Sequence, residues 1–200
     1  MAHTFSRNAA PIRLWAASGQ AALENARILV ISASATSTSI LKNLVLPGIG
    51  HFTILDDQKV TPEDAGNNFF LEGFDSVGKW RAGEAVRLLA ELNEGVSGVA
   101  STDSLDEVLD NKKEWLLEHT IVIAHNLEKN KLEKLSELVW NEPNGPVLFV
   151  VDSAGFLAEF SIQFHEHDSA SPSLKASTVS CNFTDMQYQS LKVIQKQPLR

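Results

Sequence analysis

The chain has one cysteine, one tyrosine and no excess of positive charge. A lone cysteine, Cys181, excludes an internal disulfide and is typical of a reducing compartment. The net charge of −8 argues against a nucleic-acid-binding surface. No apolar run reaches the roughly 20 residues of a membrane-spanning helix, and the first residues lack a signal-peptide core. We therefore expect a cytoplasmic or nuclear protein, or one found in both places, without nucleic-acid or membrane partners.

Glycine is missing from one turn where the surrounding pattern favours it. Residues 26–60 have the pattern of a strand, a turn, a helix and a second strand. Ile28–Ser32 and Phe52–Asp56 are typical of buried parallel strands, and Ile40–Leu46 has helical spacing. A unit of this size, with an acidic residue ending its second strand, is typical of nucleotide-binding folds whose first turn is rich in glycine. Here the turn at residues 32–37 contains only serine, alanine and threonine.

The rest of the chain continues the alternation of strands and helices. Strands are predicted at residues 96–101, 120–124 and 146–151, an alternating edge strand at 156–164, and helices at 80–93, 104–117 and 128–140. Thr61 and Pro62 predict a further, short helix start. This order predicts an α/β, Rossmann-like domain: a mostly parallel sheet with helices on both faces and an antiparallel hairpin near the end.

Two pairs of side chains near the first unit have alternative interpretations. Phe69 and Phe70 fit either the core or a partner surface, and the core is the favoured interpretation. Lys79 and Arg81 lie at a helix start, where they would either face an anion or form a solvated pair. The solvated pair is the favoured interpretation.

The later histidines and the cysteine give little sign of chemistry. His165 and His167 have a spacing compatible with a metal, but a solvated strand end is favoured and no metal site is predicted. Cys181 has no partner motif, so a catalytic thiol is not expected either.

Three motifs carry a resemblance to a known family. They are IRLW at residues 12–15, ILKNLVLPGIGHFTILD at 40–56 and VTPEDAGNNFFL at 60–71. Over about residues 11–167 the chain resembles the ThiF/MoeB-like adenylation fold of ubiquitin-like-protein activating enzymes. More narrowly, it resembles the non-catalytic regulatory subunits of the heterodimeric neddylation activating enzymes. The small subunit of the SUMO-activating enzymes is the nearest alternative.

The resemblance implies where a nucleotide site would lie. Active members bind ATP through a GxGxxG turn, and the three matching positions are Ser32, Ser34 and Ser37. Each serine adds a side chain where the backbone would approach phosphate. Asp56 keeps the position of the carboxylate that binds ribose.

Three further positions also match nucleotide-binding residues of the family. Asn67 stands where active members have an arginine, and Arg81 stands where they have a lysine. Asn126 stands in place of an aspartate that holds magnesium, and an amide is a weaker ligand for a hard cation. Most of the implied ATP site is therefore altered in charge or shape.

The resemblance implies a pseudo-adenylation half with no catalytic residues and no cofactor of its own. ATP would be bound by its partner, the catalytic subunit of a heterodimer, and the ubiquitin-like modifier would be contacted through the complex. The predicted interface residues are Arg13, Trp15, Asn67, Asn68, Phe69 and Phe70. An arginine that inactive halves often donate to the partner is replaced by Ala10, with Arg7 nearby.

We expect a flexible N-terminus at residues 1–11, the pseudo-adenylation domain at 12–167 and a divergent, poorly ordered tail at 168–200. Family members continue into a helical insertion and a returning segment, which the tail does not resemble. Two other hypotheses therefore stay open at this point: a diverged adenylyltransferase or other nucleotide-binding enzyme, and a truncated product without function.

Overall fold

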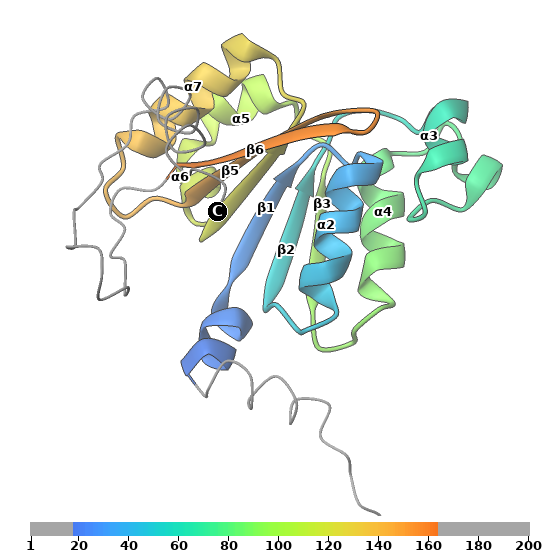
Figure 1. Cartoon of the computed structure of the whole chain (residues 1–200), viewed down its shortest axis with the longest axis horizontal. Coiled ribbons are helices and arrows are strands. Elements are labelled where there is room, and N and C mark those ends of the chain that lie inside the picture. The colour runs from blue at the N-terminus through green and yellow to red at the C-terminus, as the bar shows by residue number, and fades with distance from the viewer. Residues whose placement is uncertain (1–17, 164–200) are drawn as a thin grey trace, which may run out of the picture.

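One six-stranded sheet forms the centre of the chain in the computed structural model, which describes residues 18–163 (Figure 1). The strands are β1 (Arg27–Ile31), β2 (His51–Leu55), β3 (Ser97–Ser101), β4 (Ile121–His125), β5 (Val147–Ala154) and β6 (Leu157–Gln163). They lie in the order β3-β2-β1-β4-β5-β6. The first five are parallel, and β6 pairs antiparallel with β5. The predicted α/β fold, with a mostly parallel sheet and a late hairpin, is confirmed.

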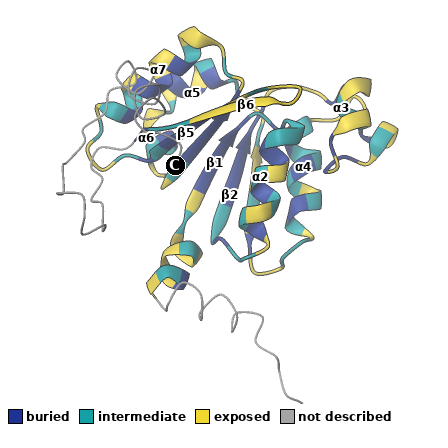
Figure 2. Ribbon diagram, viewed as in Figure 1, coloured by how far each residue is buried: buried dark blue, intermediate teal, exposed yellow. Residues whose placement is uncertain are grey.

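Helices cover both faces of the sheet, as predicted, and each face has its own apolar core (Figure 2). The elements between the strands are α2 (Ala35–Val45), α3 (Pro62–Asn67), the 3₁₀ turn η1 (Gly73–Ser76), α4 (Arg81–Ala90), α5 (Leu105–Asn111), α6 (Lys113–Leu117) and α7 (Lys129–Trp140). A further helical stretch at residues 18–25 leads into β1. Buried side chains of α2 and α4 pack on one face. Those of α5, α6 and α7 pack on the other.

The central strands are apolar on both sides because both faces are covered. Along β1, Ile28 and Val30 enter the first core, whereas Leu29 and Ile31 enter the second. Successive side chains of a strand point to opposite faces, so a continuous apolar run serves both cores at once. Each such side chain contributes roughly 1.5–3 kcal/mol when it is fully buried.

The first helix of the unit begins earlier than its apolar spacing predicted. The sequence placed it at Ile40–Leu46, but α2 spans Ala35–Val45. Ser34 is the N-cap, and its Oγ accepts a hydrogen bond from the backbone N–H of Ser37. The first turn of α2 is made of alanine, serine and threonine, so it carries no apolar stripe that would reveal a helix.

Other element boundaries differ from the prediction in smaller ways. The helix predicted at residues 104–117 is broken at Lys112, where φ is −131° and ψ is 37°. The strand predicted to end at Val151 continues to Ala154, because its last residues pair with β6. The short helix start is confirmed, since Thr61 caps α3 with a reciprocal bond to Asp64. Within residues 18–163, no helix combines the length and apolar character needed to cross a bilayer.

Candidate functional site

The candidate site lies at the edge of the sheet where β1, β2 and β4 end. The chain turns away from β1 toward β2 on one side, and β4 lies on the other side of β1. The strand order therefore reverses between β1 and β4. In open parallel sheets, ligands bind at the carboxyl ends of the strands beside such a reversal.

The turn after β1 keeps a glycine-like backbone although it contains no glycine. Ser32 has φ 77°, a conformation that glycine adopts freely and serine adopts at a cost. Ser34 Oγ accepts from the Ser37 N–H at 3.2 Å and donates to Ser37 Oγ at 2.9 Å. At the start of α2, the Ser34 hydroxyl thus caps the Ser37 N–H and donates to the Ser37 hydroxyl.

Asn68, which is distant in sequence, holds this turn in place by hydrogen bonds. Its Nδ2 donates to the carbonyl of Ala33 at 3.1 Å. Its Oδ1 accepts from Thr38 Oγ1 and from the Phe70 N–H, both at 3.0 Å. The family resemblance places the altered arginine position at Asn67, but Asn67 is exposed at the end of α3. Of these two asparagines, the structure brings Asn68 to the turn.

His125 spans the reversal in strand order. The end of β4 places its Nδ1 2.8 Å from Ser34 Oγ and its Nε2 2.8 Å from Ser153 Oγ. The ring is buried. Burial lowers the pKa of His125, although the nearby Asp152 carboxylate acts in the opposite direction. A neutral imidazole therefore links the start of α2 to β4 and β5.

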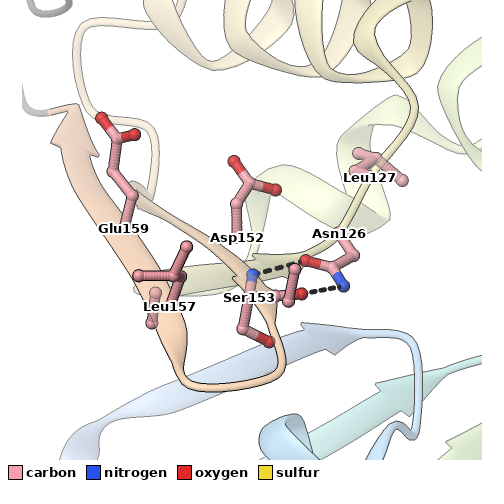
Figure 3. A pocket seen from close by; sticks show the side chains of 8 residues that line it. Asn126, Leu127, Asp152, Ser153, Leu157 and Glu159 are labelled. Atoms are coloured by element: carbon pink, nitrogen blue, oxygen red, sulfur yellow. Dashed lines mark hydrogen bonds between the residues drawn. The ribbon is translucent and has the colours of Figure 1, made fainter.

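Asn126 is held in a two-point contact with β5. Its Nδ2 donates to the Ser153 carbonyl at 2.9 Å, and its Oδ1 accepts from the Ser153 N–H at 2.8 Å (Figure 3). Its backbone has φ 47°, which asparagine tolerates better than most residues. Because the amide uses both its donor and its acceptor here, its oxygen is already engaged and poorly placed to ligate a metal ion.

The carboxylate of Asp56, which the family resemblance assigns to ribose, is engaged by the protein itself. Its Oδ2 accepts from the Ala33 N–H at 2.6 Å and from Arg81 Nε at 2.8 Å, and its Oδ1 accepts from the Gln58 N–H at 2.9 Å. Arg81 also donates through Nη1 to Asp64 Oδ1 at 3.1 Å. Burial alone would lower the pKa of Arg81, but the hydrogen bonds and charges of Asp56 and Asp64 raise it.

In two pairs of nearby residues, one member has a different environment from the one that the sequence favoured. The prediction that Lys79 and Arg81 form a solvated pair is wrong for Arg81. Its side chain is only 16% exposed and lies between two carboxylates. The side chain of Lys79 is 51% exposed, and its Nζ lies 3.5 Å from Glu84 Oε2. The expectation of a core position for Phe69 and Phe70 holds for Phe70 and is wrong for Phe69, which points into solvent.

The space beside Asp56 is small. A pocket of about 170 Å³ lies between Ser32, Asp56 and Arg81, whereas small-molecule sites usually enclose roughly 300–1,000 Å³. Serine side chains occupy the turn after β1, Arg81 pairs with Asp56, and His125 is hydrogen-bonded to Ser34. The residues present therefore fit a nucleotide poorly.

Sequence reasoning missed two contributors to this site. Asp64 contacts Arg81, and nothing in the sequence pattern signals this contact. Ser153 lies within a strand and carries no motif. Several predicted positions fall outside residues 18–163: Arg7, Ala10, Arg13, Trp15, His165, His167 and Cys181.

Comparison with known sequences gives two concordant findings. A family model described as "ThiF family" matches residues 5–125. The chain is also similar to proteins named "NEDD8-activating enzyme E1 regulatory subunit". It is 45% identical to those of Gallus gallus and Xenopus laevis and 44% identical to that of Danio rerio, in each case over 78% of this chain. The chain spans 29% of the length of each of these relatives.

Solved structures agree on the fold. The tRNA N6-threonylcarbamoyladenosine dehydratase TcdA of E. coli, in complex with AMP, superimposes with a TM-score of 0.59 at 18% identity. The match covers 74% of this chain and 59% of that one. A second structure of the same enzyme gives a TM-score of 0.60 and covers 60% of that chain. At this identity the likeness concerns the fold alone.

Proposed function

Because this chain belongs to the ThiF family, we propose that it provides the adenylation-fold part of a regulatory subunit of a neddylation activating enzyme. The observation that carries this proposal is its 45% identity to relatives with that name over 78% of the chain. Those relatives are much longer, since the chain spans 29% of their length. The role proposed for it is therefore that of one part of such a subunit.

We further propose that this part is non-catalytic and holds no ATP of its own. The support comes from charges and shapes at the edge of the sheet. Arg81 pairs with Asp56, while the Ser34 hydroxyl donates to the Ser37 hydroxyl. The side-chain amide of Asn126 bonds to the backbone of Ser153 in β5 through both its donor and its acceptor. In this account ATP is bound by the partner subunit, which carries out adenylation of the modifier and thioester formation.

The chain would act by completing a heterodimer with the catalytic subunit. Phe69, Phe74 and Trp80 are large exposed apolar side chains around α3 and η1, and exposed apolar patches commonly mark protein interfaces. Phe69 was among the interface residues predicted from the sequence. Asn68 and Phe70, predicted with it, are buried, so they would support this surface rather than touch the partner.

Co-purification with the catalytic subunit of a neddylation activating enzyme tests the pairing. The expected result is a 1:1 complex that survives gel filtration, while the chain alone supports no exchange of pyrophosphate into ATP. Absence of a complex under mild conditions would contradict the proposed partner. Exchange activity that stays with the purified chain through further chromatography would instead support a diverged adenylyltransferase.

A further inference from the structure

The tip of the β5–β6 hairpin exposes a group of large apolar side chains. Phe156, in the turn, is fully exposed, while Leu157 and Phe160 are 78% and 73% exposed. From Ala154 to Phe160 every residue is exposed, so both faces of the hairpin reach solvent here (Figure 2). Alternation along β6 places Leu157 on the same face as Asp152 and Glu159, and Phe160 on the opposite face. Large apolar side chains that protrude from both faces of one hairpin tip need a specific explanation.

The hairpin tip is a defined structure. The antiparallel pairing of β5 and β6 continues without interruption to the pair Ala154–Leu157. Gly155, with φ 60°, takes the first central position of a two-residue turn, where glycine avoids strain. Ser153 is fixed to the end of β4 by the two hydrogen bonds of Asn126. The exposed side chains are therefore presented by a backbone that needs little ordering on binding, which favours affinity.

Two acidic residues, Asp152 and Glu159, lie on the same hairpin as these apolar side chains. Asp152 and Glu159 are directly opposite each other in the strand register, and both rise on the same side of the hairpin (Figure 3). Like charges in this position destabilise a sheet. Within residues 18–163, no ion pair joins either carboxylate to a lysine or arginine.

A shallow pocket lies between this acidic pair and the end of β4. It has a volume of about 580 Å³, and its lining includes Leu127, Leu157, Asp152 and Glu159. The surface thus combines protruding aromatic rings with a hollow that has apolar walls and two carboxylates at its rim. A protein that binds this surface would need an apolar groove for the aromatic rings and a cationic side chain for the two carboxylates.

We propose that the tip of the β5–β6 hairpin, residues 152–160, docks into an apolar groove of the catalytic subunit, and that a lysine or arginine of that groove pairs with Asp152 and Glu159. This inference rests on the proposed function. A second copy of this chain fits the surface less well. A symmetric pairing would bring the same acidic patch of both copies together, and each chain carries a net charge of −8.

The first test removes the apolar side chains. The full chain with Phe156→Ser and Phe160→Ser should bind the catalytic subunit at least tenfold more weakly than the unchanged chain. Leu46→Ser with Val99→Ser removes two exposed apolar side chains elsewhere, at the end of α2 and on β3, and should change Kd less than twofold. Equal thermal unfolding transitions would show that each variant is folded.

The second test reverses the charges. Asp152→Lys with Glu159→Lys should weaken binding at least tenfold and reduce its salt dependence, because an attraction between opposite charges is screened by salt. Glu94→Lys with Glu137→Lys makes the same change of net charge on exposed residues outside the hairpin and should retain the affinity.

The binding results distinguish a failure of hairpin docking from a failure of the proposed function. If the unchanged chain binds and both hairpin variants bind equally well, the inference is overturned and the proposed function stands. If the unchanged chain does not bind, the proposed function itself fails. If the chain is a dimer that the hairpin variants convert to monomers, the groove belongs to a second copy and the inference is again overturned.

Discussion

Single side chains set the local geometry at the carboxyl edge of the sheet, and the clearest cases are Ser32, Arg81 and His125. Ser32 retains the positive φ that a glycine would supply. Arg81 keeps the positive charge of the corresponding family position but donates to Asp56 and Asp64. His125 bridges the ends of three strands through two serine hydroxyls. The turn after β1 therefore keeps a glycine-like backbone, while the polar groups around it bond to one another.

Ser32→Gly should stabilise the chain, because glycine adopts the observed φ without steric cost. The expected gain in the free energy of unfolding is up to about 1 kcal/mol, measured by urea denaturation. Ser39→Gly is the matched control in the exposed middle of α2 and should lower it by roughly 0.5–1 kcal/mol. A loss of stability in Ser32→Gly would show that the serine side chain contributes more than its backbone strain costs.

Arg81→Ala should be strongly destabilising, because it leaves the buried Asp56 carboxylate without a cation. We expect a loss of roughly 3 kcal/mol in the free energy of unfolding. Arg81→Lys should lose less, since it keeps the charge but lacks the fork that reaches Asp56 and Asp64 together. Arg87→Ala, which removes an exposed arginine from the same helix, should have little effect. Equal effects of Arg81→Ala and Arg87→Ala would contradict the proposed importance of the buried pair.

At the scale of elements, the strands were predicted well and the helix starts less well. The strands are short apolar runs covered on both faces, so composition alone reveals them. The start of α2 was missed because its first turn is small and polar, and a cap is decided by local hydrogen bonds. The break at Lys112 was missed because both halves of the predicted helix share one apolar face, and periodicity does not register a change of direction.

A chain of hydrogen bonds joins elements at the opposite, amino-terminal edge of the sheet. His119 Nδ1 lies 3.1 Å from the Leu116 carbonyl, so this nitrogen carries the proton and Nε2 accepts from Thr53 Oγ1 at 3.3 Å. His51 Nε2 then donates to Thr53 Oγ1 at 3.2 Å, and its Nδ1 accepts from Ser97 Oγ at 2.6 Å. This arrangement uses both histidines in their neutral form.

This network predicts that stability falls in mild acid. Burial, with a further contribution from the charge of Arg27, lowers the pKa of His51 and of His119. The unfolded chain then binds more protons than the folded one, so the free energy of unfolding is fully maintained above about pH 6.5 and falls below it. Urea denaturation at pH 7.5, 6.5 and 5.5 measures this slope. His119→Gln should make it shallower, and an unchanged slope in that variant would contradict the assignment.

At the scale of the whole molecule, the order of strands and helices predicted the sheet and its two covered faces. It did not predict which side chains meet at the carboxyl edge. His125 and Ser153 are separated by 28 residues, and they meet because β4 and β5 are neighbours and β5 continues past Val151, the register partner of His125. Contacts of this kind depend on side-chain direction at strand ends, which hydrophobic periodicity does not encode. The altered positions were visible in the sequence, whereas their new partners were not.

We propose that this fold fills its own nucleotide site, and a calorimetric titration of the 200-residue chain with ATP and Mg²⁺ measures this property. A cooperative thermal unfolding transition of the same sample would establish that the chain is folded. The account predicts no binding tighter than a Kd of about 1 mM. A saturable 1:1 isotherm in the micromolar range would contradict it.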